Sequence, residues 1–285
     1  YKDWSRGLGD VYKRQAMDVA LVSGDPARTV RNALKDPAAI ESYYRGWGAL
    51  FSSAPEEIQL AQQMFEETIH LEPESSIGYA LAALAYLQHA SQSTDKDALY
   101  LFDRATELAE QALQLKDVTG LADLVLANIY LRNKEHEKAL AAAERTVLAR
   151  PSCDAAFTAK AEVLNYLGRP AEAVGLAQFA MRLAPVYPAY YPAVLSAAYY
   201  GCSRFEEALD AAEISFEADS NNLDALLLIV AANVALGRLE TAKEAARKVP
   251  ILKPDFTIET FAVNHPYKDQ LHLKEIISRL KQAGL

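Results

Sequence analysis

Alanine- and leucine-rich segments alternate with short polar breaks along most of the chain, and six of these segments end in a recurring Leu/Ala-x-Pro signature or a close variant. The signature ends at positions 73, 117, 151, 185, 220 and 254. Successive signatures are therefore 44, 34, 34, 35 and 34 residues apart, and the polar residues 88–98 can hold the insertion that lengthens the first interval. An alanine-rich helical chain without repeats would also show Ala-x3-Ala spacings, but it would not keep this phase. The pattern predicts a repeated unit of 34 residues.

The same internal marks recur in each unit. Twelve positions before the end of the signature stands an alanine, and four positions later comes Phe65 or a second alanine. A turn dipeptide recurs in the middle of three units: Gly168-Arg169, Ser203-Arg204 and Gly237-Arg238. Small side chains let two helices approach closely, and glycine tolerates the left-handed conformation that ends a helix. Each unit is therefore predicted to contain two antiparallel helices, the second of which is ended by proline in most units.

Units of this length and composition are typical of tetratricopeptide repeats (TPRs). The predicted fold is all-α: a right-handed superhelical solenoid of TPR helix-turn-helix repeats with a C-terminal capping helix. Residues 16–37 are expected to form a helical lead-in, residues 38–256 six TPR-like repeats, and residues 257–285 a turn and the capping helix. Such a cap covers apolar surface that the last repeat of a solenoid would otherwise expose.

Residues 1–15 depart from this pattern and carry no helical stripe. Residues 5–15 resemble a conceptual translation of the transposase adaptor used in short-read library preparation, so we expect residues 1–15 to be non-native and disordered. A natural disordered N-terminus is the alternative. If the segment is an adaptor scar, the native chain begins upstream of Ala16 and this chain is a C-terminal fragment. Without these residues the net charge changes from −9 to −11, because they hold four of the 29 Lys and Arg residues and two of the 38 Asp and Glu residues.

Several stretches resemble the C-terminal TPR region of bacterial class III adenylate and guanylate cyclases. The resemblance lies in the lead-in, in a Pro-x-Tyr-Pro stretch and in the tail: Ser23–Arg28, Lys35–Gly46, Ala180–Tyr191, Pro254–Phe256, Pro266–Asp269 and Ala283–Leu285. In that family the repeats follow a catalytic domain, whose metal-binding aspartates have no counterpart in this chain. Related repeats also follow winged-helix transcription regulators or occur in stand-alone periplasmic-type modules. The resemblance implies an interaction region attached to a signalling enzyme.

Composition narrows the classes of function. The net charge of −9 argues against nucleic acid or an anionic membrane as the main partner. The longest apolar run, Ala225–Leu236, is too short to span a bilayer. The two cysteines, Cys153 and Cys202, form no disulfide framework and suit a reducing compartment, so a cytoplasmic location is expected.

No catalytic, cofactor or metal site is predicted, since the five histidines are scattered over different repeats and no His-x3-His or Cys-x2-Cys spacing occurs. The expected functional surface is the concave groove lined by first helices. The repeat register places six polar or aromatic residues there: Asn128, Arg132, Glu162, Asn165, Tyr166 and Tyr200. For Tyr166 and Tyr200, packing between repeats is an equal alternative to contact with a peptide. Leu124 stands where chaperone-binding TPRs have a clamp lysine, so binding of chaperone tails is not expected.

The sequence thus predicts a non-catalytic scaffold that binds a peptide or protein of unknown identity in its groove, or that self-associates as a homodimer. No cofactor is implied. The alternative is a fragment of an adenylate or guanylate cyclase, or of a winged-helix transcription regulator, whose catalytic or DNA-binding domain lies upstream.

Overall fold

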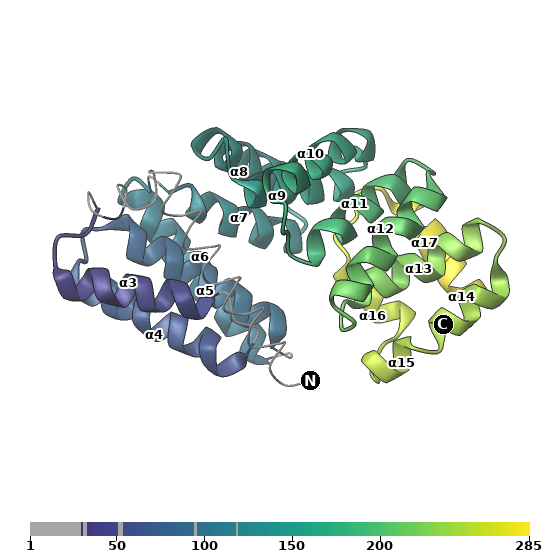
Figure 1. The fold of residues 1–285 in the computed structure, drawn as a ribbon, viewed down its shortest axis with the longest axis horizontal. Coiled ribbons are helices and arrows are strands. Elements are labelled where there is room, and N and C mark those ends of the chain that lie inside the picture. The colour runs from purple at the N-terminus through teal and green to yellow at the C-terminus, as the bar shows by residue number, and fades with distance from the viewer. Residues whose placement is uncertain (1–29, 31–32, 51–53, 94–95, 118) are drawn as a thin grey trace. The chain divides into compact units, whose positions relative to one another are not determined.

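The computed structural model describes residues 30, 33–50, 54–93, 96–117 and 119–285, and all regular elements within them are helices (Figure 1). The suspected adaptor segment, residues 1–15, lies outside the described residues, as do 16 of the 22 residues of the predicted lead-in. None of the described helices is long and apolar enough to cross a membrane. The chain divides into two compact units between Leu126 and Ala127, within helix α7 (Leu121–Arg132), and each unit is described by itself.

The described part of the first unit contains two helix pairs and the start of a third. The first pair is α3 (Pro37–Leu50) and α4 (Pro55–Leu71), and the second is α5 (Ser76–Gln92) and α6 (Lys96–Gln114). Within these two pairs, α3 packs on α4, α4 on α5, and α5 on α6.

The second unit continues with the helix-turn-helix arrangement. After the end of α7 come seven helices up to the last signature: α8 (His136–Ala149), α9 (Asp154–Tyr166), α10 (Pro170–Leu183), α11 (Tyr190–Gly201), α12 (Phe205–Ala218), α13 (Leu223–Ala235) and α14 (Leu239–Ala246). The short α15 (Val249–Leu252) follows, and two more helices complete the chain: α16 (Ile258–Asn264) and α17 (Gln270–Gln282). In addition to packing on its neighbour, α9 contacts α11 and α11 contacts α13. These first helices of successive pairs form one surface, which we call the first-helix face.

The turns inside the pairs repeat one backbone geometry. In the last four pairs, the second residue after the first helix has a positive φ, between 60° and 77°: Lys134, Ser203, Gly168 and Gly237. The next amide donates to a carbonyl five residues earlier, for example Arg169 N–H to Leu164 O and Arg238 N–H to Asn233 O, both within 2.9 Å. This is the Schellman ending of a helix. This helix ending explains why the Gly-Arg and Ser-Arg turns recur in the sequence. Lys134 takes the same conformation, although it is not a glycine.

Alanines fill the crossing points between paired helices. The alanine twelve positions before each signature is fully buried in all six pairs, with no exposed surface: Ala61, Ala105, Ala139, Ala173, Ala208 and Ala242. In the first pair, Phe65 replaces the second alanine, and the facing helix has Gly46. A Cβ atom at Gly46 would lie 2.7 Å from the Phe65 ring, so the large residue on one helix is accommodated by the absent side chain on the other.

Nine of the ten extra residues of the first interval lie in lengthened helices. α5 and α6 have 17 and 19 residues, whereas the later pair α9 and α10 has 13 and 14. The insertion therefore lengthens both helices of one pair by a little over one turn each, at about 3.6 residues per turn, instead of adding a loop.

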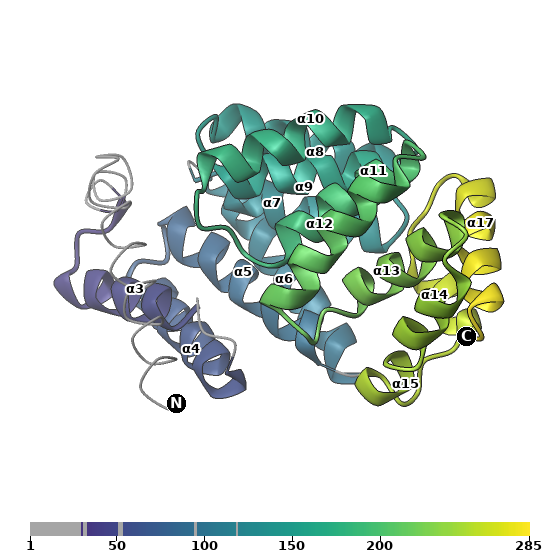
Figure 2. The same ribbon diagram turned by 45° about the vertical axis from the view of Figure 1, so that its right-hand side comes forward.

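The C-terminal helix reaches beyond the last pair. α17 packs on α13 (Figure 2), as a cap on the last repeat would, but Arg279 in α17 also donates a hydrogen bond to the hydroxyl of Tyr200 in α11. The α17 N-cap, Asp269, lies within reach of the turn after α9, since a Cβ at Gly168 would be 3.7 Å from it. The C-terminal segment thus contacts three successive repeats.

Close packing at the end of α11 gives a first prediction. A Cβ at Gly201 would lie 2.7 Å from the stiff ring of Pro170, whereas nothing lies within 4 Å of the corresponding position at Gly175. Gly201→Ala should lower the free energy of unfolding of the second unit by about 1–3 kcal/mol, measured by thermal and urea denaturation. Gly175→Ala, in an exposed part of α10, is the matched control and should leave stability unchanged or raise it by up to about 1 kcal/mol. Equal stability of the two variants would contradict the close approach.

Candidate functional site

The first-helix face of the second unit, together with the turn between α7 and α8 and the start of α8, carries a segment of the chain's own C-terminus. Residues 263–268, which run from the end of α16 toward α17, are held mostly through their backbone. Lys134 Nζ donates to the carbonyl of Val263 at 2.9 Å, and His136 Nε2 lies 2.7 Å from the carbonyl of Pro266. The Lys268 amide donates to the carbonyl of Tyr166 at 2.8 Å. Because main-chain groups make these bonds, this face accommodates an extended segment.

Side chains reinforce this docking. Lys268 forms an ion pair with Glu137 and lowers the pKa of that exposed carboxylate. The Tyr267 ring packs edge-on against Tyr166 with a centroid distance of 4.8 Å. His136 is only 8% exposed, so its bond to Pro266 is shielded from water. The segment is therefore a packed part of the second unit.

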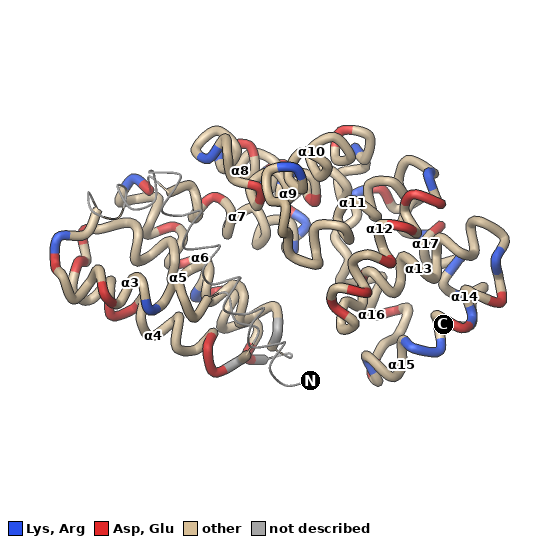
Figure 3. The backbone as a smooth tube through the Cα atoms, viewed as in Figure 1, with Lys and Arg blue, Asp and Glu red and all other residues tan. Residues whose placement is uncertain are grey.

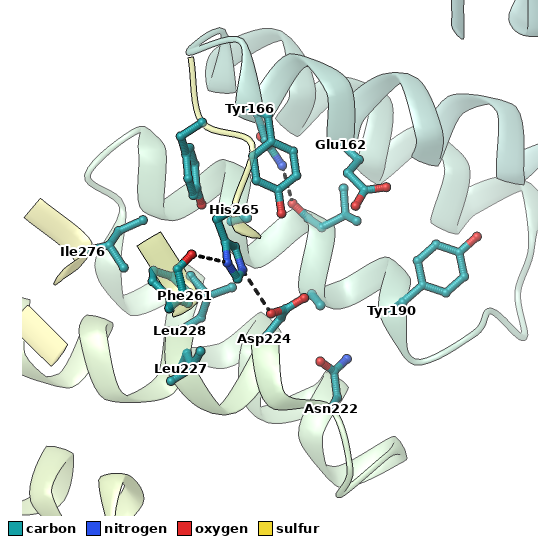
Figure 4. Close-up of a pocket in the computed structure, with 15 residues that line it drawn as sticks. Glu162, Tyr166, Tyr190, Asn222, Asp224, Leu227, Leu228, Phe261, His265 and Ile276 are labelled. Atoms are coloured by element: carbon teal, nitrogen blue, oxygen red, sulfur yellow. Dashed lines mark hydrogen bonds and ion pairs between the residues drawn. The ribbon is translucent and has the colours of Figure 1, made fainter. Parts of the chain in front are cut away.

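A cavity of about 130 Å³ remains beside this segment (Figure 4). Its walls come from four places in the sequence. Glu162, Asn165 and Tyr166 project from α9, and Tyr190 and Val194 come from α11. The start of α13 adds Asn222, Asp224, Leu227 and Leu228, and the C-terminal segment adds Phe261, His265, Tyr267 and Ile276. A second cavity of about 90 Å³ lies toward the ends of α9 and α11, and Asn165 lines both.

Two carboxylates shape the electrostatics of the larger cavity. Burial, and to a smaller extent the negative charge of Asp224, raise the pKa of the half-buried Glu162 to about 7. Desolvation also acts to raise the pKa of Asp224, but its hydrogen bond with His265 and the charge of that ring outweigh this and lower it below its usual value. His265 Nε2 lies 3.4 Å from the Asp224 carboxylate, and its Nδ1 lies 3.0 Å from the Phe261 carbonyl (Figure 4). Since both ring nitrogens face acceptors, both contacts are hydrogen bonds only when the ring is an imidazolium.

The tyrosines of the cavity stay protonated. Burial, the largest cause, raises the pKa values of Tyr166 and Tyr267 well above their usual range. Their hydroxyl groups are therefore neutral donors and acceptors at any physiological pH. Among the described residues no group of three or more His, Cys, Asp or Glu side chains is arranged to hold a metal ion.

The structure brings together three of the six residues that the repeat register selected. Glu162, Asn165 and Tyr166 line the same cavity. Tyr200 is 2% exposed, and its ring packs against Phe205 and His272, so packing between elements accounts for it, which was the alternative expectation. Asn128 is half-buried and Arg132 exposed on α7, and neither lines this cavity.

The register missed the residues that complete the site. Tyr190 and Asp224 stand in the first turns of α11 and α13, and His136 stands at the start of a second helix. His265 belongs to the His-Pro-Tyr-Lys-Asp stretch of the tail, which was assigned to a capping turn alone. The density of aromatic and polar residues in that stretch was the available signal that it did more than connect two helices.

Comparison with known proteins shows similarity of fold. No protein-family model and no curated protein sequence matches the chain. Among solved structures, a thermophilic TPR protein of Thermus thermophilus aligns with a TM-score of 0.51 and 18% identity, over 70% of this chain and 99% of that one. The Cut9–Hcn1 hetero-tetramer of the APC/C gives a TM-score of 0.64 at 15% identity, over 82% of this chain and 44% of that one. IFIT1 with Gppp-AAAA gives 0.62 at 14% identity, over 95% of this chain and 64% of that one.

This chain has the TPR fold. The prediction of an all-helical TPR solenoid is confirmed by these neighbours and by the helix pairs.

The docked C-terminal segment gives a second prediction. His136→Leu removes the donor to the Pro266 carbonyl, and a hydrogen bond lost in a shielded position costs about 1–3 kcal/mol. The Lys268 amide should then exchange with solvent faster than in the unchanged chain, measured by hydrogen–deuterium exchange. His70→Leu, at an exposed position of α4, is the matched control and should leave this exchange rate unchanged. Unaltered protection of Lys268 in His136→Leu would show that the contact does not hold the segment.

Proposed function

We propose that the chain is a non-catalytic protein-interaction module whose first-helix face in the second unit binds an extended segment of a partner protein. The observation that carries the proposal is the docking of residues 263–268 by backbone hydrogen bonds to Lys134, His136 and Tyr166. A face that holds one extended segment through main-chain groups presents chemistry suited to another, because those groups are common to all peptides.

The charge of the chain supports a protein partner. Acidic residues outnumber basic residues by 38 to 29, and Figure 3 shows both signs interspersed along the helices. A polyanion such as nucleic acid would need a basic surface to offset its phosphates. We therefore assign a peptide or protein ligand, and no catalytic role, to this region.

The resemblance to cyclase-associated repeats supports a wider setting. We place the module in the C-terminal part of a bacterial, cytoplasmic signalling protein such as an adenylate cyclase, where partner binding regulates an upstream domain. Self-association of two copies is a second route to the same regulation, since class III cyclases act as dimers. A winged-helix regulator is the alternative setting, and the genomic sequence upstream of residue 16 distinguishes the two.

Selection of peptides tests the interaction face. Peptides selected from a random display library on the full chain should bind at least tenfold more weakly to Tyr190→Ala, since loss of a central aromatic contact costs about 1.4 kcal/mol or more. Tyr190 is 45% exposed at the cavity, so its truncation should leave the fold intact. Tyr100→Ala, at a 65% exposed tyrosine of the first unit, is the matched control and should not change the affinity. Failure to select any peptide, or equal affinity for both variants, would argue against this face.

The self-association route has its own measurement. Sedimentation velocity of the full chain should show a sedimentation coefficient that rises with concentration if copies pair. A constant monomeric value up to the highest attainable concentration removes this route and leaves partner capture.

In the same preparation a nucleotide-cyclase assay should give no turnover, and any turnover would overturn the non-catalytic assignment.

A further inference from the structure

A buried hydrogen-bond acceptor without a donor belongs to Asn165, which lines the larger cavity of the second unit. Asn165 is 8% exposed, and its Oδ1 has no hydrogen-bond partner among the described residues. The orientation of the amide is fixed, because its Nδ2 donates to the Val194 carbonyl at 2.9 Å. A buried acceptor left unpaired is costly, so this oxygen calls for a donor from a bound molecule.

The carboxylate of Glu162 adds a second acceptor to the same cavity. No hydrogen bond or ion pair to Glu162 is formed within the described part of the chain, although Asp224 is near enough to raise its pKa. Neither Lys nor Arg lines the cavity. The only lining group that can carry a positive charge is His265, which faces Asp224. The cavity therefore has an excess of negative charge.

The remaining walls suit a cation with a flat apolar surface. Tyr166, Tyr190 and Tyr267 line the cavity, and the faces of aromatic rings attract guanidinium and ammonium groups. The volume of about 130 Å³ corresponds to roughly four water molecules at about 30 Å³ each. This space is large enough for the end of one side chain.

We propose that this cavity is a specificity pocket for an arginine side chain of the partner, with the guanidinium donating to Asn165 Oδ1 and to the Glu162 carboxylate. The inference rests on the proposed function, since it supplies the side-chain recognition for a peptide held on the same face. Arginine fits better than lysine because its planar group carries five N–H donors in a fixed fork, which can serve separate acceptors at once.

The pocket should bind more tightly as pH rises. Six titratable groups face it from α9, α11, α13 and the C-terminal segment: Glu162, Tyr166, Tyr190, Asp224, His265 and Tyr267. The tyrosines stay neutral. A Glu162 pKa of about 7 means that the carboxyl group is mostly protonated at pH 6 and mostly ionised at pH 8. Ionisation of Glu162 alone strengthens binding of a cation by about tenfold between these pH values.

The probe for this inference is N-acetyl-arginine amide, titrated into the full chain and followed by NMR chemical shifts. We expect saturable shifts at Tyr166, Tyr190 and His265 and an affinity about tenfold higher at pH 8 than at pH 6. N-acetyl-citrulline amide, the neutral isostere, should bind at least tenfold more weakly. Equal binding of both compounds would overturn the proposal.

Substitutions locate the binding. Glu162→Gln should lower the affinity for the arginine probe at pH 8 at least tenfold and abolish most of its pH dependence. Because ionisation of Glu162 is unfavourable in the folded chain, this variant should unfold at no lower temperature than the unchanged chain at pH 8. Glu213→Gln, at an exposed position of α12, makes the same charge change and should leave the affinity unaltered. An unchanged affinity in Glu162→Gln would overturn the pocket assignment.

Two further outcomes separate this inference from the proposed function. If library-selected peptides bind Glu162→Gln as tightly as the unchanged chain, the arginine pocket is wrong and the interaction face stands. If the arginine probe binds but no peptide is ever selected, the interaction face fails and the guanidinium site remains.

Methylguanidine that binds as tightly as the arginine probe would assign the pocket to a free guanidine compound and overturn a peptide source.

Discussion

The close approach of two helices at an alanine is the constraint on which the repeats depend. Ala139, Ala173, Ala208 and Ala242 are completely buried where paired helices cross. A larger side chain at such a point would push the helices apart. The displacement would reach the next pair, because α8, α10 and α12 each also pack on the first helix that follows. The spacing between crossing points is thus fixed by the chain length of one helix, one turn, a second helix and a second turn. This is why a fixed phase can be read from the sequence at all.

Local marks made the repeats predictable, since everything that defines a pair lies within 34 residues. The turns at Gly168, Ser203 and Gly237 and the buried alanines follow directly from such marks. The docking of the tail does not follow from any local mark. His136 and Pro266 are 130 residues apart in sequence, and neither belongs to a periodic pattern. The register selected Glu162, Asn165 and Tyr166 because they project from one first helix, whereas His265 reaches the cavity only through the path of the C-terminal segment.

The C-terminal tail covers part of the first-helix face and so changes which surface a partner can contact. A bare face would expose the Tyr166 ring and the Tyr166 carbonyl, but Tyr267 and the Lys268 amide cover them. What remains open is narrower: two cavities, of which the larger is lined by Glu162, Asn165 and Asp224. The C-terminal segment is accordingly both a structural element and a wall of the site, and a partner must fit beside it.

A stack of repeats ordinarily behaves as a one-dimensional array in which each unit is stabilised only by its neighbours, so its ends fray one pair at a time. The bonds from residues 263–268 back to Lys134, His136 and Tyr166 close a long loop that encloses several pairs. Closing a loop of this size costs entropy that rises only slowly with its length, and once closed it prevents α14 or α12 from detaching without breaking contacts near α8. The second unit is therefore expected to unfold cooperatively as a whole, unlike an open array of the same helices.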